Sequence, residues 1–158
     1  MLTYDLTSLL STFEQWALFC EELKNLSDKQ WASSLEPGKW SIKDIVCHMM
    51  RWDRYFYESA IRPIATGEEL TLRHLNYDEF NKESMDIAVS LTPSELVQQT
   101  IDARMDIISE IHAMPEGVRE GKYTDADGNE FYIPQYLQDF IWHDRHHMGP
   151  LQQYLKAI

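Results

Sequence analysis

Apolar residues recur at steps of three and four positions along most of the chain, which is the spacing of one face of an α-helix. The pattern predicts four long helices: residues 5–25, a helix that begins at residue 41 and is ended by Pro63 and Gly67, and residues 92–114 and 134–157. A shorter helical pattern covers residues 77–88, and the segment 66–76 before it is expected to be a loop. Most of the chain is therefore predicted to be helical.

Two of the long helices open on clear start signals. Ser41 is a suitable N-cap, with Asp44 three residues later in the position of a capping box. Thr92 is followed by Pro93 and Glu95, so an N-cap, a proline in the first turn and an acidic third residue occur together. Pro63 and Gly67 are expected to end the helix that Ser41 starts.

Residues 116–133 depart from the helical pattern. Two short β-type runs, 121–124 and 130–133, flank the dipeptide Asp127-Gly128, which is typical of a type I′ turn. Asp125, Asp127 and Asn129 also have the spacing that begins an EF-hand calcium loop, but the glutamate expected at its twelfth position is missing. The segment is therefore predicted to be a hairpin.

These elements predict an all-α fold for a single domain over residues 1–158. The expected architecture is a four-helix bundle with a long crossover connection, an extra short helix and a small hairpin before the last helix. Sites in such bundles are built from side chains on facing helices.

The last helix carries three histidines within five residues, His143, His146 and His147. His143 and His147 are four positions apart and so lie on one face, where two imidazoles can reach one metal ion. His146 falls on the other side. The alternative is a helix end with incidental histidines, since cations suit a helix C-terminus.

The second helix directs one more histidine toward the interior. On a helical wheel His48 shares an arc with apolar and aromatic residues such as Met49 and Trp52. Cys47 lies off that arc and is expected to be structural or exposed, not a ligand. His48, His143 and His147 can therefore converge.

Asp144 lies among the apolar positions of the last helix. A buried carboxylate needs partners, so we expect it to contact a hydroxyl, an indole N–H or a basic group. Asp144 and Asp53 are candidates for orienting an imidazole N–H or a water molecule beside the site.

Composition excludes some classes of partner. The chain has 26 acidic and 14 basic residues and a formal net charge of −12, which argues against nucleic-acid binding. It contains no apolar run of the roughly 18 residues that a membrane span needs. Cys20 and Cys47 are too few for a disulfide framework, so we expect a reduced, cytoplasmic protein. Its five tryptophans, eight tyrosines and seven methionines are expected mainly in the core, and they also suit an apolar ligand pocket.

Three motifs, in this order, resemble the DinB superfamily, which includes the YfiT-like metal-dependent hydrolases. They are the run from Gly38 to Ile45 followed by His48, then Phe80-Asn81, then His143-Asp144-Arg145-His146-His147. The resemblance covers nearly the whole chain. It implies that His48, His143 and His147 bind a divalent metal and that the protein is a homodimer. It also implies bacillithiol- or mycothiol-dependent chemistry among the relatives.

Three histidines leave coordination positions open, so Zn²⁺ or Ni²⁺ could activate water or a thiol there. The hypothesis is a metal-dependent hydrolase, or a low-molecular-weight-thiol S-transferase, acting on a small molecule. Arg51, Arg54 and Arg145 point away on the wheels, which weakens the version with an acidic thiol cofactor. The alternative is a non-catalytic bundle that binds a metal or a small apolar ligand.

Overall fold

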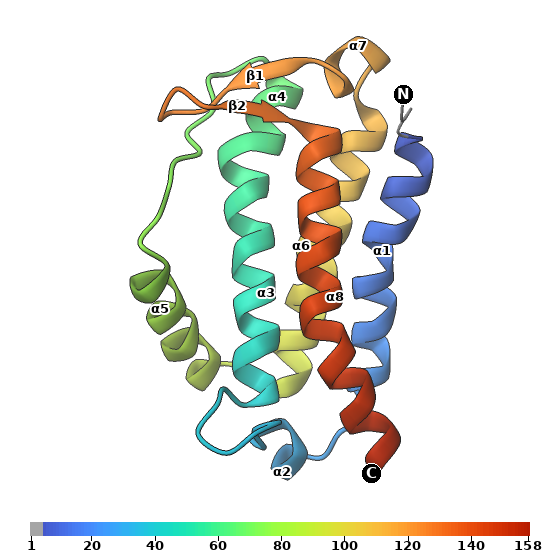
Figure 1. The fold of residues 1–158 in the computed structure, drawn as a ribbon, viewed down its shortest axis with the longest axis vertical. Coiled ribbons are helices and arrows are strands. Elements are labelled where there is room, and N and C mark those ends of the chain that lie inside the picture. Colours follow the sequence, from blue (N-terminus) through green and yellow to red (C-terminus); the bar gives the residue numbers. More distant parts are fainter. Residues whose placement is uncertain (1–4) are drawn as a thin grey trace.

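The computed structural model describes residues 5–158, so the first four residues of the predicted domain lie outside the described part. Four long helical segments run along the molecule (Figure 1). They are α1 (Leu6–Leu23), α3 (Ile42–Phe56) with its continuations η1 (Tyr57–Ile61) and α4 (Arg62–Thr66), α6 (Pro93–Ala113), and α8 (Ile133–Ala157). The shorter elements are α2 (Asp28–Trp31), α5 (Tyr77–Ser90), α7 (Glu116–Arg119), β1 (Lys122–Thr124) and β2 (Glu130–Tyr132).

The long helices form the predicted bundle. Helix α6 packs against α1 and α3, and α8 packs against α1. As Figure 1 shows, α1 and α8 run in one direction while α3 and α6 run in the other. Since α3 and α6 are parallel, the chain must return along the bundle between them, and this return carries α5 along the outer side of α3. The predicted long crossover and extra short helix are both confirmed.

The predicted helix starts are present as capping boxes. The Ser41 side chain accepts from the Asp44 N–H at 3.1 Å, and the Asp44 carboxylate accepts from the Ser41 N–H at 3.2 Å. Thr92 and Glu95 make the same reciprocal pair at the start of α6. Each pair satisfies backbone donors that a helix N-terminus otherwise leaves free.

Of the two residues predicted to end the helix that begins after Ser41, Gly67 is confirmed as its end, whereas Pro63 does not interrupt it. The helix passes through a π-helical turn and ends at Gly67, whose φ is +77°. Pro63 has no N–H to donate to the carbonyl of Ser59, four residues earlier. That carbonyl instead accepts from the N–H groups of Thr71 and Leu72 in the crossover, at 3.0 and 3.2 Å. A distant segment therefore replaces the bond that proline removes.

The hairpin is present, but its turn is not type I′. Thr124 pairs with Glu130, so the loop has five residues instead of two. A type I′ turn needs a positive φ at both central residues, and in residues 5–158 only glycines have one, here Gly128. The Asp125 carboxylate organises the loop by accepting from the N–H groups of Asp127 and Asn129, both at 2.9 Å.

The core consists of two apolar clusters, one toward each end of the bundle. The cluster near α2 includes Trp16, Trp31 and Ile42, and the cluster near the hairpin includes Phe13 and Ile61. Much of the aromatic content is therefore core, as expected. In the described part of the chain, no helix is both long enough and apolar enough to cross a bilayer.

Candidate metal centre

Three histidines from two helices meet in the space between α3 and α8. His48 lies on α3, and His143 and His147 lie one turn apart on α8. Each offers one ring nitrogen, and these nitrogens all lie within 4.8 Å of one another. Nε2 of His48 lies 3.5 Å from Nε2 of His143. The structure therefore brings together the residues that sequence analysis selected.

Asn81 orients the imidazole of His48. It lies on α5, and its side-chain oxygen is 2.9 Å from Nδ1 of His48. An amide oxygen only accepts, so this contact places the imidazole proton on Nδ1 and leaves a lone pair on Nε2. That lone pair faces the other two histidines. The crossover thus positions a group beside the site.

The electrostatic surroundings keep all three imidazoles neutral. Burial is the main cause that lowers the pKa of His48, His143 and His147, each to about 4, and neighbouring imidazoles lower it further. At neutral pH each ring therefore retains a free lone pair. Three neutral nitrogen donors in reach of one point are a donor set that fits a divalent transition metal.

His146 lies outside this group. Its ring stacks on the exposed Trp142 side chain with a centroid separation of 5.6 Å. The helical wheel predicted this separation from His143 and His147, because residue 146 points to another side of α8. His146 is therefore a natural comparison residue for the three histidines.

The two candidate carboxylates bind an arginine that sequence analysis did not select. Among the described residues, Asp53 and Asp144 are hydrogen-bonded to Arg104 of α6 and not to an imidazole. The predicted hydrogen bond to an imidazole N–H is thus not seen, and a role in orienting a water molecule stays a prediction. The expectation that Asp144 meets a basic group is confirmed, and Arg104 is that group.

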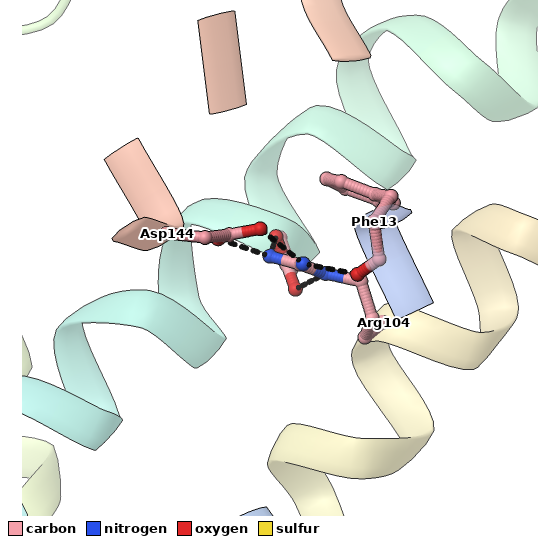
Figure 2. A network of polar contacts seen from close by, with 4 residues as sticks. Phe13, Arg104 and Asp144 are labelled. Carbon is pink, nitrogen blue, oxygen red and sulfur yellow. Dashed lines mark hydrogen bonds and ion pairs between the residues drawn. The ribbon is translucent and has the colours of Figure 1, made fainter. Parts of the chain in front are cut away.

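Arg104 joins all four long helices (Figure 2). Its guanidinium donates to Asp53 on α3 at 2.8 and 3.2 Å and to Asp144 on α8 at 2.8 and 3.0 Å. The fifth N–H donates to the carbonyl of Phe13 on α1 at 2.8 Å, and the Phe13 ring covers the guanidinium at 3.7 Å. Every donor of this buried side chain is satisfied. Because Asp144 follows His143 directly, the network also fixes the part of α8 that carries the site.

Burial governs the ionisation of this network. It raises the pKa of Asp53 and raises the pKa of Asp144 to about 6, although Arg104 acts in the opposite direction. Burial alone would lower the pKa of Arg104, but the two carboxylates raise it above its ordinary value. One guanidinium between two carboxylates leaves a net negative charge, so neither acid is fully compensated.

A cavity of about 390 Å³ adjoins the histidines. The aromatic side chains of Trp52, Phe56, Tyr77 and Phe140 form most of its wall, and His48, Asn81 and His143 form its polar side. A second hollow, of about 530 Å³, begins at His147 and includes Lys39, Trp40 and His146. The histidine group can therefore be reached from more than one surface opening.

Neither cysteine belongs to the site. Cys47 is buried, and its sulfur lies 3.3 Å from the carbonyl oxygen of Ser84 on α5, so it is structural and the exposed alternative is wrong. Burial raises the pKa of Cys47 to about 11 and also raises the pKa of Cys20. Both sulfurs are thus protonated at neutral pH and are poor nucleophiles.

The three arginines also stay outside the aromatic cavity. Arg51 lies over the Phe80 ring at 4.4 Å and donates to the Phe80 carbonyl at 3.1 Å. Arg54 is 3.8 Å from Asp106 on the α6 side, and Arg145 lines a different surface hollow. The wheels had predicted that these side chains point away.

The fold is a four-helix bundle with a long crossover. Its facing helices carry three histidines that can bind one metal ion, and these two features together define the class of protein. The chain belongs to the DinB superfamily, whose sequence model matches residues 13–151. The family resemblance seen in the sequence motifs is therefore confirmed.

Several solved structures share the fold. YfiT from Bacillus subtilis, described as a probable metal-dependent hydrolase with an unusual four-helix bundle topology, has a TM-score of 0.76 and 12% identity over 96% of this chain and 86% of its own. A mycothiol-dependent maleylpyruvate isomerase has a TM-score of 0.75 and 16% identity over 96% of this chain. This chain spans 63% of the isomerase. No curated protein matches the sequence.

Proposed function

We propose that this protein is a metal-dependent enzyme in which His48, His143 and His147 hold a divalent cation. The observation that carries the proposal is the convergence of three imidazole nitrogens, from two helices, within 4.8 Å. Catalytic zinc sites commonly use three protein ligands and keep a further position open for water or substrate.

The donor set favours particular metals. Imidazole nitrogen suits Zn²⁺, Ni²⁺ and Cu²⁺, whereas Mg²⁺ and Ca²⁺ prefer oxygen ligands. We propose Zn²⁺ or Ni²⁺ as the native ion. When bound, such an ion acts as a Lewis acid that lowers the pKa of water or of a thiol near neutrality.

The surrounding side chains limit the chemistry. The described residues that line the aromatic cavity include no carboxylate and no thiol, and both cysteine sulfurs are buried elsewhere. The nucleophile must therefore come from outside the chain, as water or as a thiol. Asn81 holds His48 in one tautomer, and aromatic side chains form most of the cavity wall. These features support either hydrolysis or transfer to a small thiol.

The two reactions make different demands on the site. YfiT is described as a probable hydrolase, and the isomerase depends on the thiol mycothiol. An acidic thiol finds no cation in the aromatic cavity, whereas Lys39 lies in the second hollow beside His147. A charged thiol cofactor would therefore have to approach through the second hollow.

A second candidate function is non-catalytic binding of a metal and a small ligand. The apolar cavity beside the histidines favours this function, because such a cavity can bind a small ligand without catalysing a reaction. Turnover distinguishes the two functions.

The test begins with metal binding by tag-free protein. Isothermal titration with ZnCl₂ and NiCl₂ should give one site per chain, and His48→Ala and His147→Ala should abolish it. His146→Ala is the matched control and should leave it intact, since His146 lies outside the group. An absence of binding by the unaltered protein would contradict the proposal.

Activity is then measured on the metal-loaded protein with a panel of small esters and amides, and with cysteine or glutathione plus monochlorobimane. We expect turnover that requires the metal and is lost in His147→Ala. Stoichiometric metal binding without turnover on any substrate of the panel would favour the non-catalytic function.

A further inference from the structure

The aromatic cavity has a lining that selects for one chemical class of ligand. We propose that it binds a small uncharged molecule with an aromatic or similarly apolar body and one donor atom directed at the histidines. The proposal rests on the proposed metal site, since the donor atom is the group that the metal would receive. It adds which molecules that site accepts.

The wall of the cavity is already built. The Trp52 ring packs on Phe80 with a centroid separation of 4.2 Å, and the Phe56 ring packs on Phe140 at 4.8 Å and on Tyr136 at 4.9 Å. These contacts hold the rings in place. A preformed aromatic wall binds a flat apolar group with little ordering cost, and stacked or edge-on rings add favourable contacts.

The charges around the cavity exclude ionic ligands. None of its lining residues is a lysine or an arginine. Arg51, the basic residue nearest in sequence to Trp52, is held at the α3–α5 contact by Phe80 and Ser84. With a net charge of −12 on the chain and no basic residue in the lining, an anionic group held away from the metal position gains no compensating partner. A cationic ligand would be repelled by the positive charge of the bound metal.

The polar side of the cavity matches a carbonyl-type group. The oxygen of Asn81 is occupied by His48, so its amide NH₂ group is left for an acceptor atom of the ligand. His48 and His143 line the cavity beside it. An ester, amide or ketone oxygen can therefore be held between the amide and the metal position.

The volume sets an upper limit on ligand size. At about 390 Å³ the cavity is near the low end of the roughly 300–1,000 Å³ range of ligand pockets. It suits a single-ring compound with a short side chain. A large thiol conjugate would have to extend out of it.

The test uses three probes that share one imidazole nitrogen as the metal donor: imidazole, 1-benzylimidazole and 4-(imidazol-1-ylmethyl)benzoate. Their dissociation constants are measured by titration calorimetry on zinc-loaded, tag-free protein. We expect 1-benzylimidazole to bind about 10- to 100-fold more tightly than imidazole, because its ring is buried in the cavity. The benzoate should lose at least about 30-fold relative to 1-benzylimidazole, because its charge has no partner.

Phe140→Ala and Trp142→Ala form a matched pair, since both remove an aromatic side chain from α8 but only Phe140 lines the cavity. Trp142 is 68% exposed on the outer side. Phe140→Ala should remove most of the preference for the benzyl group, and Trp142→Ala should preserve it. If Phe140→Ala does not fold by circular dichroism, Tyr77→Ala replaces it, because Tyr77 lines the cavity and is 54% exposed.

Equal affinities for imidazole and 1-benzylimidazole would overturn the proposal, as would tight binding of the benzoate or an equal effect of the two α8 variants. If the protein binds no zinc, the proposed function fails by itself. The same probes on metal-free protein then decide the ligand class. A retained preference for the uncharged benzyl probe supports it, and a lost preference overturns it.

Discussion

Replacing Arg104 by methionine should expose how strongly the buried network supports the bundle. Methionine has a similar length but no charge, so Asp53 and Asp144 would remain buried without a cation. Both carboxylates are almost fully buried and receive two hydrogen bonds each from Arg104. Removing one partner of a buried ion pair costs about 3–5 kcal/mol. The free energy of unfolding of domains is about 5–15 kcal/mol, so Arg104→Met should be marginally stable or unfolded near pH 7.

The assay is urea denaturation of metal-free protein, followed by circular dichroism. The triple variant Arg104→Met, Asp53→Leu and Asp144→Leu is the control, because it removes the charges together. The Phe13 carbonyl then loses its bond from Arg104 but keeps its helical bond within α1. Losing that one bond should cost about 0.5–1.5 kcal/mol, less than the lone substitution. The difference in the free energy of unfolding between the single and the triple variant measures the penalty of the unpaired charges, separately from the loss of packing.

The pH dependence of the stability of Arg104→Met tests the same reasoning independently. Burial raises the pKa of both carboxyls in the folded protein, and losing Arg104, which lowers these pKa values, raises them further. Protonation then removes the penalty, so the deficit of Arg104→Met relative to the unaltered protein should shrink as the pH falls from about 7 to about 5. A loss under about 1 kcal/mol, or a triple variant no more stable than the single one, would refute this account.

Two further predictions concern the histidines. Burial lowers the pKa of His48, His143 and His147 to about 4 in the folded protein, from 6.5 in the unfolded chain. Below about pH 6.5 the unfolded chain therefore binds more protons than the folded protein, and the metal-free protein loses stability as the pH falls toward 4. The melting temperature of the unaltered protein should fall more steeply between pH 6.5 and 4 than that of His147→Gln. Parallel plots of melting temperature against pH for the two proteins would contradict the lowered histidine pKa values. Asn81→Leu should weaken zinc binding by about 10- to 100-fold, because the partner of a ligand histidine sets its tautomer. Calorimetry with ZnCl₂ measures this, with the exposed Asn129→Leu as a control, and unchanged affinity would remove Asn81 from the site.

Local signals in the sequence were enough to predict the bundle and the histidine group. The caps at Ser41 and Thr92 act within one helical turn, so they can be recognised without knowing the fold. His48, His143 and His147 were selected because helical periodicity places them on interior faces, and those faces do meet.

The features that were missed depend on contacts between distant segments. Continuation through Pro63 requires N–H groups from Thr71 and Leu72, which no local pattern shows. Arg104 carried a usable signal, because it lies on the apolar face of α6 just as Asp144 lies on that of α8. Two opposite charges on buried faces predict an ion pair, but the sequence does not show that Asp53 and Phe13 share the same guanidinium.

The central claim is that the three histidines bind one divalent cation. A crystal structure of tag-free, zinc-loaded protein, with anomalous data collected on both sides of the zinc edge, tests it directly. The account predicts one anomalous peak between α3 and α8, about 2.0–2.1 Å from a ring nitrogen of each of His48, His143 and His147. A structure without that peak, or with zinc bound only at other residues, would contradict it.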